Sequence, residues 1–201
     1  GIHIADVSHF VGEKSELDSE ARKRGTSIYL VDRTIPMLPE VLSNNLCSLN
    51  PNEPKYAFSA VFVMDKEAQV KERWFGKTLI ESDKRFTYEE AQEILDKKSG
   101  IFFDELKTLN ELAKKLRVEK FRKGAIDFET EEVKFELDSL GKPIRVYKKE
   151  RKDTHKLIED FMLLSNREVA TYMNIAGGKN SRGSFVYRIH DTPNIEKLQA
   201  L

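Results

Sequence analysis

The 201-residue sequence predicts an α+β fold in which a mixed, mostly antiparallel and curved sheet packs against several helices. Three observations predict this class. Residues 56–64 and 70–81 are rich in β-branched and aromatic residues and flank a short polar link, which is typical of paired strands. Residues 155–173 carry apolar side chains at helical spacing. A stripe of leucines predicts a further helix: Leu106, Leu109, Leu112 and Leu116.

The first quarter of the chain is predicted to combine short strands and short helices. Residues 1–8 indicate a largely buried strand, and residues 18–24 favour a helix. Gly25 suits the end of that helix, because glycine adopts a left-handed conformation at little cost. Residues 27–31 predict another strand, and two prolines then impose an irregular segment before a short helix near residues 40–46.

A capping box marks the start of a helix in the middle of the chain. Thr87 and Glu90 have the spacing at which each side chain bonds the backbone N–H of the other residue. The helix is therefore expected to begin at Tyr88 and to end near Gly100.

The last third is predicted to contain a hairpin, a loop, a strand and a helix. Residues 133–137 alternate between apolar and charged, and residues 139–142 form a turn into a second strand. Residues 176–184 are a glycine-rich loop, residues 185–189 favour a strand, and residues 194–201 begin a helix. No internal repeat or interdomain linker divides these elements, so we expect one structural unit.

Composition and charge limit the function classes. Hydrophobic residues make up 39% and charged residues 34% of the chain, and no apolar run is long enough to span a bilayer. Cys47 is the only cysteine, which excludes an intramolecular disulfide and a cysteine-based zinc site and favours the cytoplasm. The net charge is +0, so binding to a polyanion must rest on local geometry.

Local charge clusters offer two candidate sites, each with an ordinary alternative. Basic residues gather at Lys148, Lys149, Arg151, Lys152 and Lys156. They could contact phosphates, but a solvated face is the more common role of such residues. Acidic residues gather at Glu129, Glu131 and Glu132, where an exposed edge is again favoured over a metal site.

A metal site built from His3, Asp6 and His9 is disfavoured by strand geometry. His3 and Asp6 would project to opposite faces of an extended strand, and His3 and His9 would lie about 20 Å apart. We therefore expect a structural role for this segment.

Six blocks of sequence, taken in order, carry a family resemblance: GIHIADVSHFV (1–11), RGTSIYLVDRTIPMLPEVLSNNLCSLNP (24–51), DKRFTYE (83–89), RKGAIDF (122–128), HKLIEDFMLLSN (155–166) and YRIHDTP (187–193). Together they resemble the RNB catalytic domain shared by ribonuclease II and ribonuclease R, most closely that of bacterial ribonuclease R. The resemblance implies that residues 1–201 are part of such a domain, without its N-terminal metal-binding segment and its C-terminal part.

The resemblance implies a 3′ to 5′ exoribonuclease that hydrolyses single-stranded RNA and releases nucleoside 5′-monophosphates. Family members use Mg²⁺, which activates water and stabilises the leaving oxygen. Their aspartate cluster precedes the HIADVSH block, so the metal ligands are expected upstream of Gly1 and no catalytic or metal residue is assigned within the chain. The expected partner is the 3′ end of single-stranded RNA, bound by a monomer within a larger multidomain protein.

Two aromatic residues are implied to hold RNA bases. The family places a base-stacking ring at the position of Tyr29, and such stacking tolerates any base. The alternative is an ordinary strand tyrosine packed in the core. Phe128 resembles the second ring of the same clamp.

Three polar residues are implied to contact the sugar and the phosphates. Tyr88 and Glu159 match the family pair at the terminal ribose, where both can hydrogen-bond the 2′-hydroxyl that DNA lacks. The alternatives are a surface tyrosine beside the helix cap and a carboxylate that pairs with His155 or with water. Arg188 could meet a phosphate, although a buried ion pair is equally compatible with its position.

Two other hypotheses for the function of the chain remain open. It could be an RNA-binding module without catalytic activity, or an inert fragment whose sheet edge and apolar faces are exposed.

Overall fold

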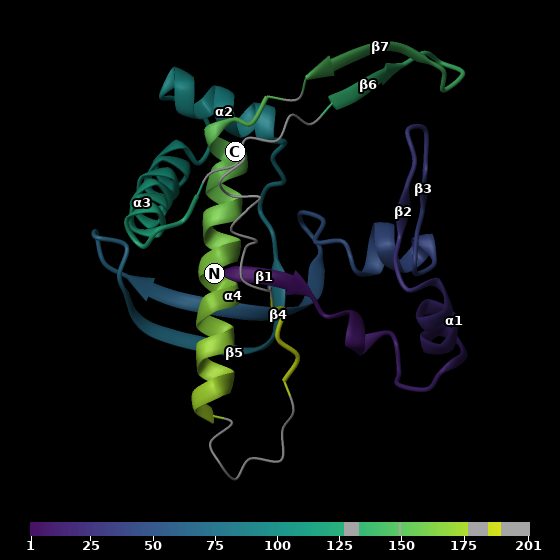
Figure 1. The fold of residues 1–201 in the computed structure, drawn as a ribbon, viewed down its shortest axis with the longest axis horizontal. Coiled ribbons are helices and arrows are strands. Elements are labelled where there is room, and N and C mark those ends of the chain that lie inside the picture. Colours follow the sequence, from purple (N-terminus) through teal and green to yellow (C-terminus); the bar gives the residue numbers. More distant parts are fainter. Residues whose placement is uncertain (127–132, 149, 177–184, 190–201) are drawn as a thin grey trace, which may run out of the picture.

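A computed structural model describes residues 1–126, 133–148, 150–176 and 185–189 (Figure 1). The predicted α+β class is confirmed, because long helices lie beside antiparallel strands. In the described ranges the strands form three small sheets, of three, two and two strands, instead of one curved sheet.

The largest sheet has the strand order β1-β4-β5 and is antiparallel throughout. Its strands are β1 (Ile2–Ala5), β4 (Pro54–Met64) and β5 (Val70–Glu81), so the predicted central strand pair is confirmed. Side chains alternate between its two faces, as a pleated strand requires. Ala57 and Ser59 are fully buried, and the intervening Phe58 is half-exposed.

The first strand is shorter and less buried than the sequence predicted. It ends at Ala5 instead of residue 8, and Ile4 is 64% exposed. The reason is its position, because among the described residues β1 lies at an edge of the sheet and pairs with β4 alone. An apolar strand sequence indicates extended backbone but does not reveal how many neighbours the strand has.

Two helical segments of the N-terminal region follow the sequence. Helix α1 (Glu16–Arg24) begins two residues before the predicted start, where Ser15 Oγ accepts a hydrogen bond from the Asp18 N–H. Gly25 ends it at φ +69°, a left-handed conformation. The short helix near residues 40–46 is confirmed at Val41–Leu46.

Two hairpins extend from the rest of the molecule and meet at their turns (Figure 1). One pairs β2 (Ile28–Tyr29) with β3 (Thr34–Ile35), and the second pairs β6 (Val133–Leu137) with β7 (Pro143–Lys148), which confirms the predicted hairpin. A Cβ added to Gly141 in the β6–β7 turn would lie 3.7 Å from the Asp32 Cβ in the β2–β3 turn.

Three helices pack together on one side of the largest sheet. They are α2 (Tyr88–Lys97), α3 (Phe103–Arg122) and α4 (Asp153–Ala176), and α4 crosses β1 in Figure 1. The predicted capping box starts α2: the Glu90 N–H donates to Thr87 Oγ1 and the Thr87 N–H donates to a Glu90 carboxylate oxygen. No helix in the described ranges combines the length and apolar character needed to cross a bilayer.

A buried ion pair joins α3 to α4. Asp160, whose side chain is 3% exposed, accepts from Arg117 Nε at 2.9 Å and lies 2.8 Å from Arg117 Nη2. Because each charge is out of water, each depends on the other for its stabilisation. The pair therefore fixes the packing of the two longest helices.

Three predicted C-terminal elements have different outcomes. The strand at residues 185–189 is wrong, because this segment is exposed and has no strand partner among the described residues. Alternating apolar residues suit a strand, but a strand is stable only beside another. The predicted loop (apart from Ala176, the last residue of α4) and the helix at residues 194–201 lie outside the described residues.

Replacing Asp160 by Asn should lower the free energy of unfolding of the 201-residue chain by about 3 kcal/mol, because Arg117 is then left buried without a counter-charge. Glu93→Gln is the matched control, since it removes a carboxylate from the exposed Glu93–Lys97 pair and should change stability little. Urea unfolding followed by circular dichroism measures both. Equal effects of the two variants, or a gradual transition in the parent chain, would contradict this role of the ion pair.

Candidate functional site

Tyr88 is held at the junction of α2 and α4. It is the first residue of α2, directly after the Thr87 cap. Its carbonyl oxygen accepts from Thr154 Oγ1 at 3.0 Å, and the Thr154 N–H donates to Gln92 Oε1 at 3.2 Å. Thr154 is 4% exposed, so these bonds are shielded from water and tie the first turn of α2 to the first turn of α4.

The Tyr88 ring is stacked on the His155 ring. The ring centroids are 4.0 Å apart and the planes are inclined by 14°. His155 Nδ1 accepts from the Lys152 N–H at 3.3 Å, so the imidazole is itself anchored to the backbone at the start of α4. Tyr88 is 43% exposed, so it is both anchored and accessible to a ligand. The alternative expected for Tyr88, a surface residue beside the helix cap, therefore describes its position, and the ribose role stays a prediction.

Glu159 lies one helical turn after His155 on α4 and is held by two cations. It pairs with Arg151, and Lys120 Nζ lies 3.6 Å from its Oε1. The His155 ring stacks on Tyr88 and the Glu159 carboxylate pairs with Arg151, so the pairing of Glu159 with His155 stays a prediction. Arg151, one of the predicted basic cluster, is exposed and pairs with Glu159.

Tyr29 stands apart from this group. It lies on the β2–β3 hairpin, which Figure 1 shows well away from the junction of α2 and α4. Its side chain is 79% exposed, so the alternative of a tyrosine packed in the core is wrong. An exposed ring offers a face for stacking. The structure therefore places Tyr88 against His155, one helical turn from Glu159, and places Tyr29 elsewhere on the surface.

The remaining predicted site residues are on the C-terminal third. Arg188 is exposed, so the alternative of a buried ion pair is wrong. Phe128 lies outside the described residues. The acidic group lies there too: Glu129, Glu131 and Glu132.

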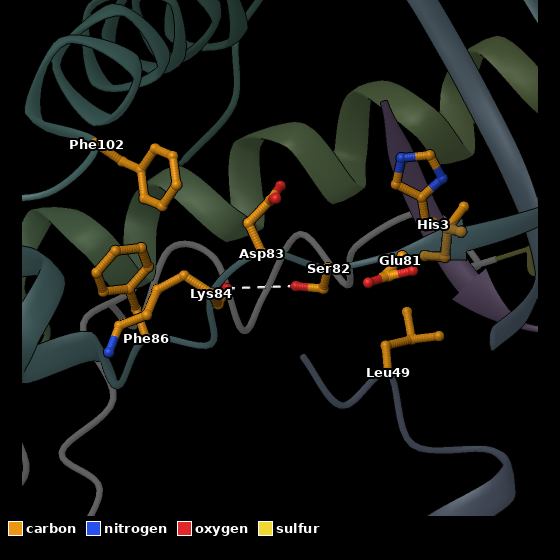
Figure 2. Close-up of a pocket in the computed structure, with 9 residues that line it drawn as sticks. His3, Leu49, Glu81, Ser82, Asp83, Lys84, Phe86 and Phe102 are labelled. Atoms are coloured by element: carbon orange, nitrogen blue, oxygen red, sulfur yellow. Dashed lines mark hydrogen bonds between the residues drawn. The ribbon is translucent and has the colours of Figure 1, made fainter. Parts of the chain in front are cut away.

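A cavity of about 410 Å³ lies beside the segment that leads into α2 (Figure 2). Phe86 and Phe102 flank one end of it, with ring centroids 6.4 Å apart in an edge-to-face arrangement, and His3 lies towards the other end. Asp83 and Lys84 also line it. Sequence reasoning missed this pair of rings: the DKRFTYE block contains Phe86, but nothing in the pattern placed Phe102 opposite.

His3, Asp6 and His9, which the sequence disfavoured as a metal site, each contact a different partner. His3 Nδ1 lies 2.6 Å from Ser59 Oγ, and His9 stacks on a tyrosine of β4. Asp6 is 7% exposed and lies 2.9 Å from Lys77 Nζ, and the bond from Lys77 lowers the pKa of its carboxyl group. Within the described ranges, no three His, Cys, Asp or Glu side chains are grouped so that they could hold a metal ion.

Comparison with curated proteins shows close relatives from bacteria and eukaryotes. The chain is 40% identical to DIS3-like exonuclease 2 of Schizosaccharomyces pombe over 98% of its length, and 39% identical to ribonuclease R 1 of Lactococcus lactis over 99%. It is also 38% identical over 99% to a protein named inactive exonuclease DIS3L2 of Arabidopsis thaliana. The chain spans only about a quarter of these relatives, at 23%, 24% and 20% of their lengths.

Solved structures show the same fold. The chain matches Mycoplasma genitalium RNase R in complex with ribose methylated single-stranded RNA with a TM-score of 0.87 and 31% identity, over 98% of this chain and 31% of that one. Yeast Ssd1, a pseudonuclease, matches at a TM-score of 0.67 and 22% identity over 88% of this chain and 22% of that one, which shows the fold alone. The RNB domain model matches residues 1–201, and the chain therefore belongs to the RNB domain family of ribonuclease II and ribonuclease R.

Proposed function

We propose that this chain is the substrate-holding part of a 3′ to 5′ exoribonuclease, where it binds the end of single-stranded RNA and selects ribose over deoxyribose. The observation that carries the proposal is the stack of Tyr88 on His155 of α4, one helical turn before Glu159. A phenol hydroxyl can donate or accept a hydrogen bond, and an ionised carboxylate accepts. Both suit a 2′-hydroxyl, which donates and accepts.

Base stacking on Tyr29 would hold the strand without reading its sequence. The ring is largely exposed on a hairpin, so a base could reach its face without rearrangement of the core. Phe128 is proposed as a second stacking ring and Arg188 as a phosphate contact, both on the family resemblance. Membership of the RNB family and relatives solved with RNA support these assignments.

Hydrolysis of the phosphodiester, which would release nucleoside 5′-monophosphates, is proposed for the longer protein that contains this segment. The described residues do not fit a magnesium site, because their carboxylates are not grouped as ligands. We therefore assign the metal ligands to residues outside the described part and derive no catalytic step here. Cytoplasmic localisation stays a prediction from the single cysteine.

An RNA-binding protein without nuclease activity is the second candidate. One observation favours it: a relative 38% identical over 99% of the chain carries the name inactive exonuclease. The two candidates separate when the full-length protein is incubated with Mg²⁺ and uniformly labelled RNA. Mononucleotides support the exoribonuclease, whereas retained binding without mononucleotides supports the inactive module.

Tyr29→Ala in the full-length protein should weaken single-stranded RNA binding by about 1 to 3 kcal/mol, because one stacked base is lost. Tyr29→Phe keeps the flat ring and should bind like the parent. Fluorescence anisotropy with a 5′-labelled oligonucleotide, in EDTA and at one fixed salt concentration, measures the Kd. Equal Kd values for the alanine variant and the parent would remove Tyr29 from the site. Because the Tyr29 side chain is largely exposed, the alanine variant should fold like the parent.

Tyr88→Phe and Glu159→Ala should both reduce the preference for RNA over DNA. Loss of one hydrogen bond to a hydroxyl lowers the preference by about threefold for the neutral phenol and about tenfold for the carboxylate. The ratio of Kd values for RNA and DNA oligonucleotides of one sequence is the measurement. Glu93→Ala, which removes an exposed carboxylate elsewhere on α2, is the control. The ribose assignment is wrong if both site variants discriminate as well as this control.

A further inference from the structure

The selectivity proposed above requires more than the presence of two polar groups. A phenol and a carboxylate recognise one hydroxyl only if both point to the same place, and Tyr88 is 43% exposed at the first position of a helix. A ring at such a position would sample several rotamers if nothing held its plane. The question is therefore what orients the Tyr88 ring.

His155 provides that constraint. Its ring covers one face of the Tyr88 ring at a centroid distance of 4.0 Å, and the two planes are nearly parallel. The contact joins α2 to α4 across 67 positions of the chain, so it can form only when the two helices are correctly docked. An offset or parallel aromatic pair of this kind resists rotation of either ring.

The imidazole is itself fixed in direction. Its Nδ1 accepts from the Lys152 N–H at 3.3 Å, so the proton of the neutral ring lies on Nε2. The preceding residue, Thr154, is buried and bonds the Tyr88 carbonyl oxygen at 3.0 Å. Backbone and ring of Tyr88 are thus both held by consecutive residues of α4.

The carboxylate lies on the same helix, one turn away. Glu159 follows His155 by four positions, which places the two side chains on one face of α4. The Glu159 carboxylate pairs with Arg151 and lies 3.6 Å from Lys120 Nζ, so two cations restrain it. His155 thus contacts the Tyr88 ring and lies one helical turn from Glu159.

We propose that His155 is a positioning residue for ribose selection: it orients the Tyr88 ring so that the phenol and Glu159 converge on one 2′-hydroxyl. The proposal rests on the proposed function of Tyr88 and Glu159. His155 itself touches Tyr88, and no contact between His155 and the RNA is required.

The test uses the full-length protein and two ligands, an RNA oligonucleotide and the same oligonucleotide with a single 2′-deoxyribose at its 3′ end. His155→Ala should lower the preference for the all-ribose ligand by about two- to tenfold, the range that corresponds to one aromatic pair. His155→Phe keeps a flat ring against Tyr88 and should restore the preference. His155→Gln keeps polar bulk without a ring and should behave like the alanine variant.

A double-mutant cycle separates positioning from general destabilisation. If His155 acts through Tyr88, the preference of Tyr88→Phe should be unchanged by further substitution of His155 by Ala. A His155→Ala variant that loses affinity for both ligands equally, with the preference intact, would overturn the positioning role. So would an unchanged preference in His155→Ala while Tyr88→Phe reduces it. If neither Tyr88→Phe nor Glu159→Ala changes the preference, the proposed function itself fails.

Discussion

The buried pair of Asp160 and Arg117 fixes how α4 is rotated about its own axis. A rotation of α4 would carry a buried carboxylate away from the Arg117 guanidinium, which is costly in a low-dielectric interior. Successive residues of a helix differ by about 100° in direction, so a fixed Asp160 also fixes Glu159. Glu159 is thereby turned towards Arg151 and Lys120, at the edge of the α3–α4 interface.

The same orientation of α4 also determines which of its residues contact α2. Thr154 and Leu157 lie on the buried side of α4, and Thr154 bonds the first turn of α2 through the Tyr88 carbonyl oxygen. His155 then faces the Tyr88 ring. One buried polar contact between two long helices therefore determines the direction of three side chains at the surface. A chain with no net charge can therefore present a specific polar site, because the specificity comes from the placement of side chains and not from the electrostatic field of the whole chain.

The sequence predicted those parts of the fold whose signals are local. The capping box at Thr87, the β4–β5 pair and the leucine stripe of α3 each depend on residues within one element or one hairpin. The partner strand β3 was missed, because the turn at Asp32 lacks the Asn-Gly or Gly signal of a tight hairpin. The strand expected at residues 185–189 failed for a related reason: alternation does not reveal whether a neighbouring strand exists.

The sequence predicted only part of the candidate site, for the same reason. Family resemblance named Tyr88 and Glu159, but the stack of Tyr88 on His155 joins residues far apart in sequence, and periodicity carries no information on such a contact. The pairing of Glu159 with His155 was a reasonable local expectation, because residues four apart share a helix face. The structure adds contacts that this local spacing does not reveal: the imidazole stacks on the Tyr88 ring, and the carboxylate bonds Arg151.

The ion pairs also explain why the carboxylates of the described residues do not form a metal site. Carboxylates on several elements each face a cation: Asp6 faces Lys77, Asp153 faces Lys114, Glu159 faces Arg151, and Asp160 faces Arg117. The bond from Lys114 lowers the pKa of Asp153, so this carboxylate stays ionised and already paired. A divalent metal instead needs several carboxylates that face one another without intervening cations. Among the described residues these acidic groups are therefore engaged in ion pairs that join elements of the fold, and they are not available together as metal ligands.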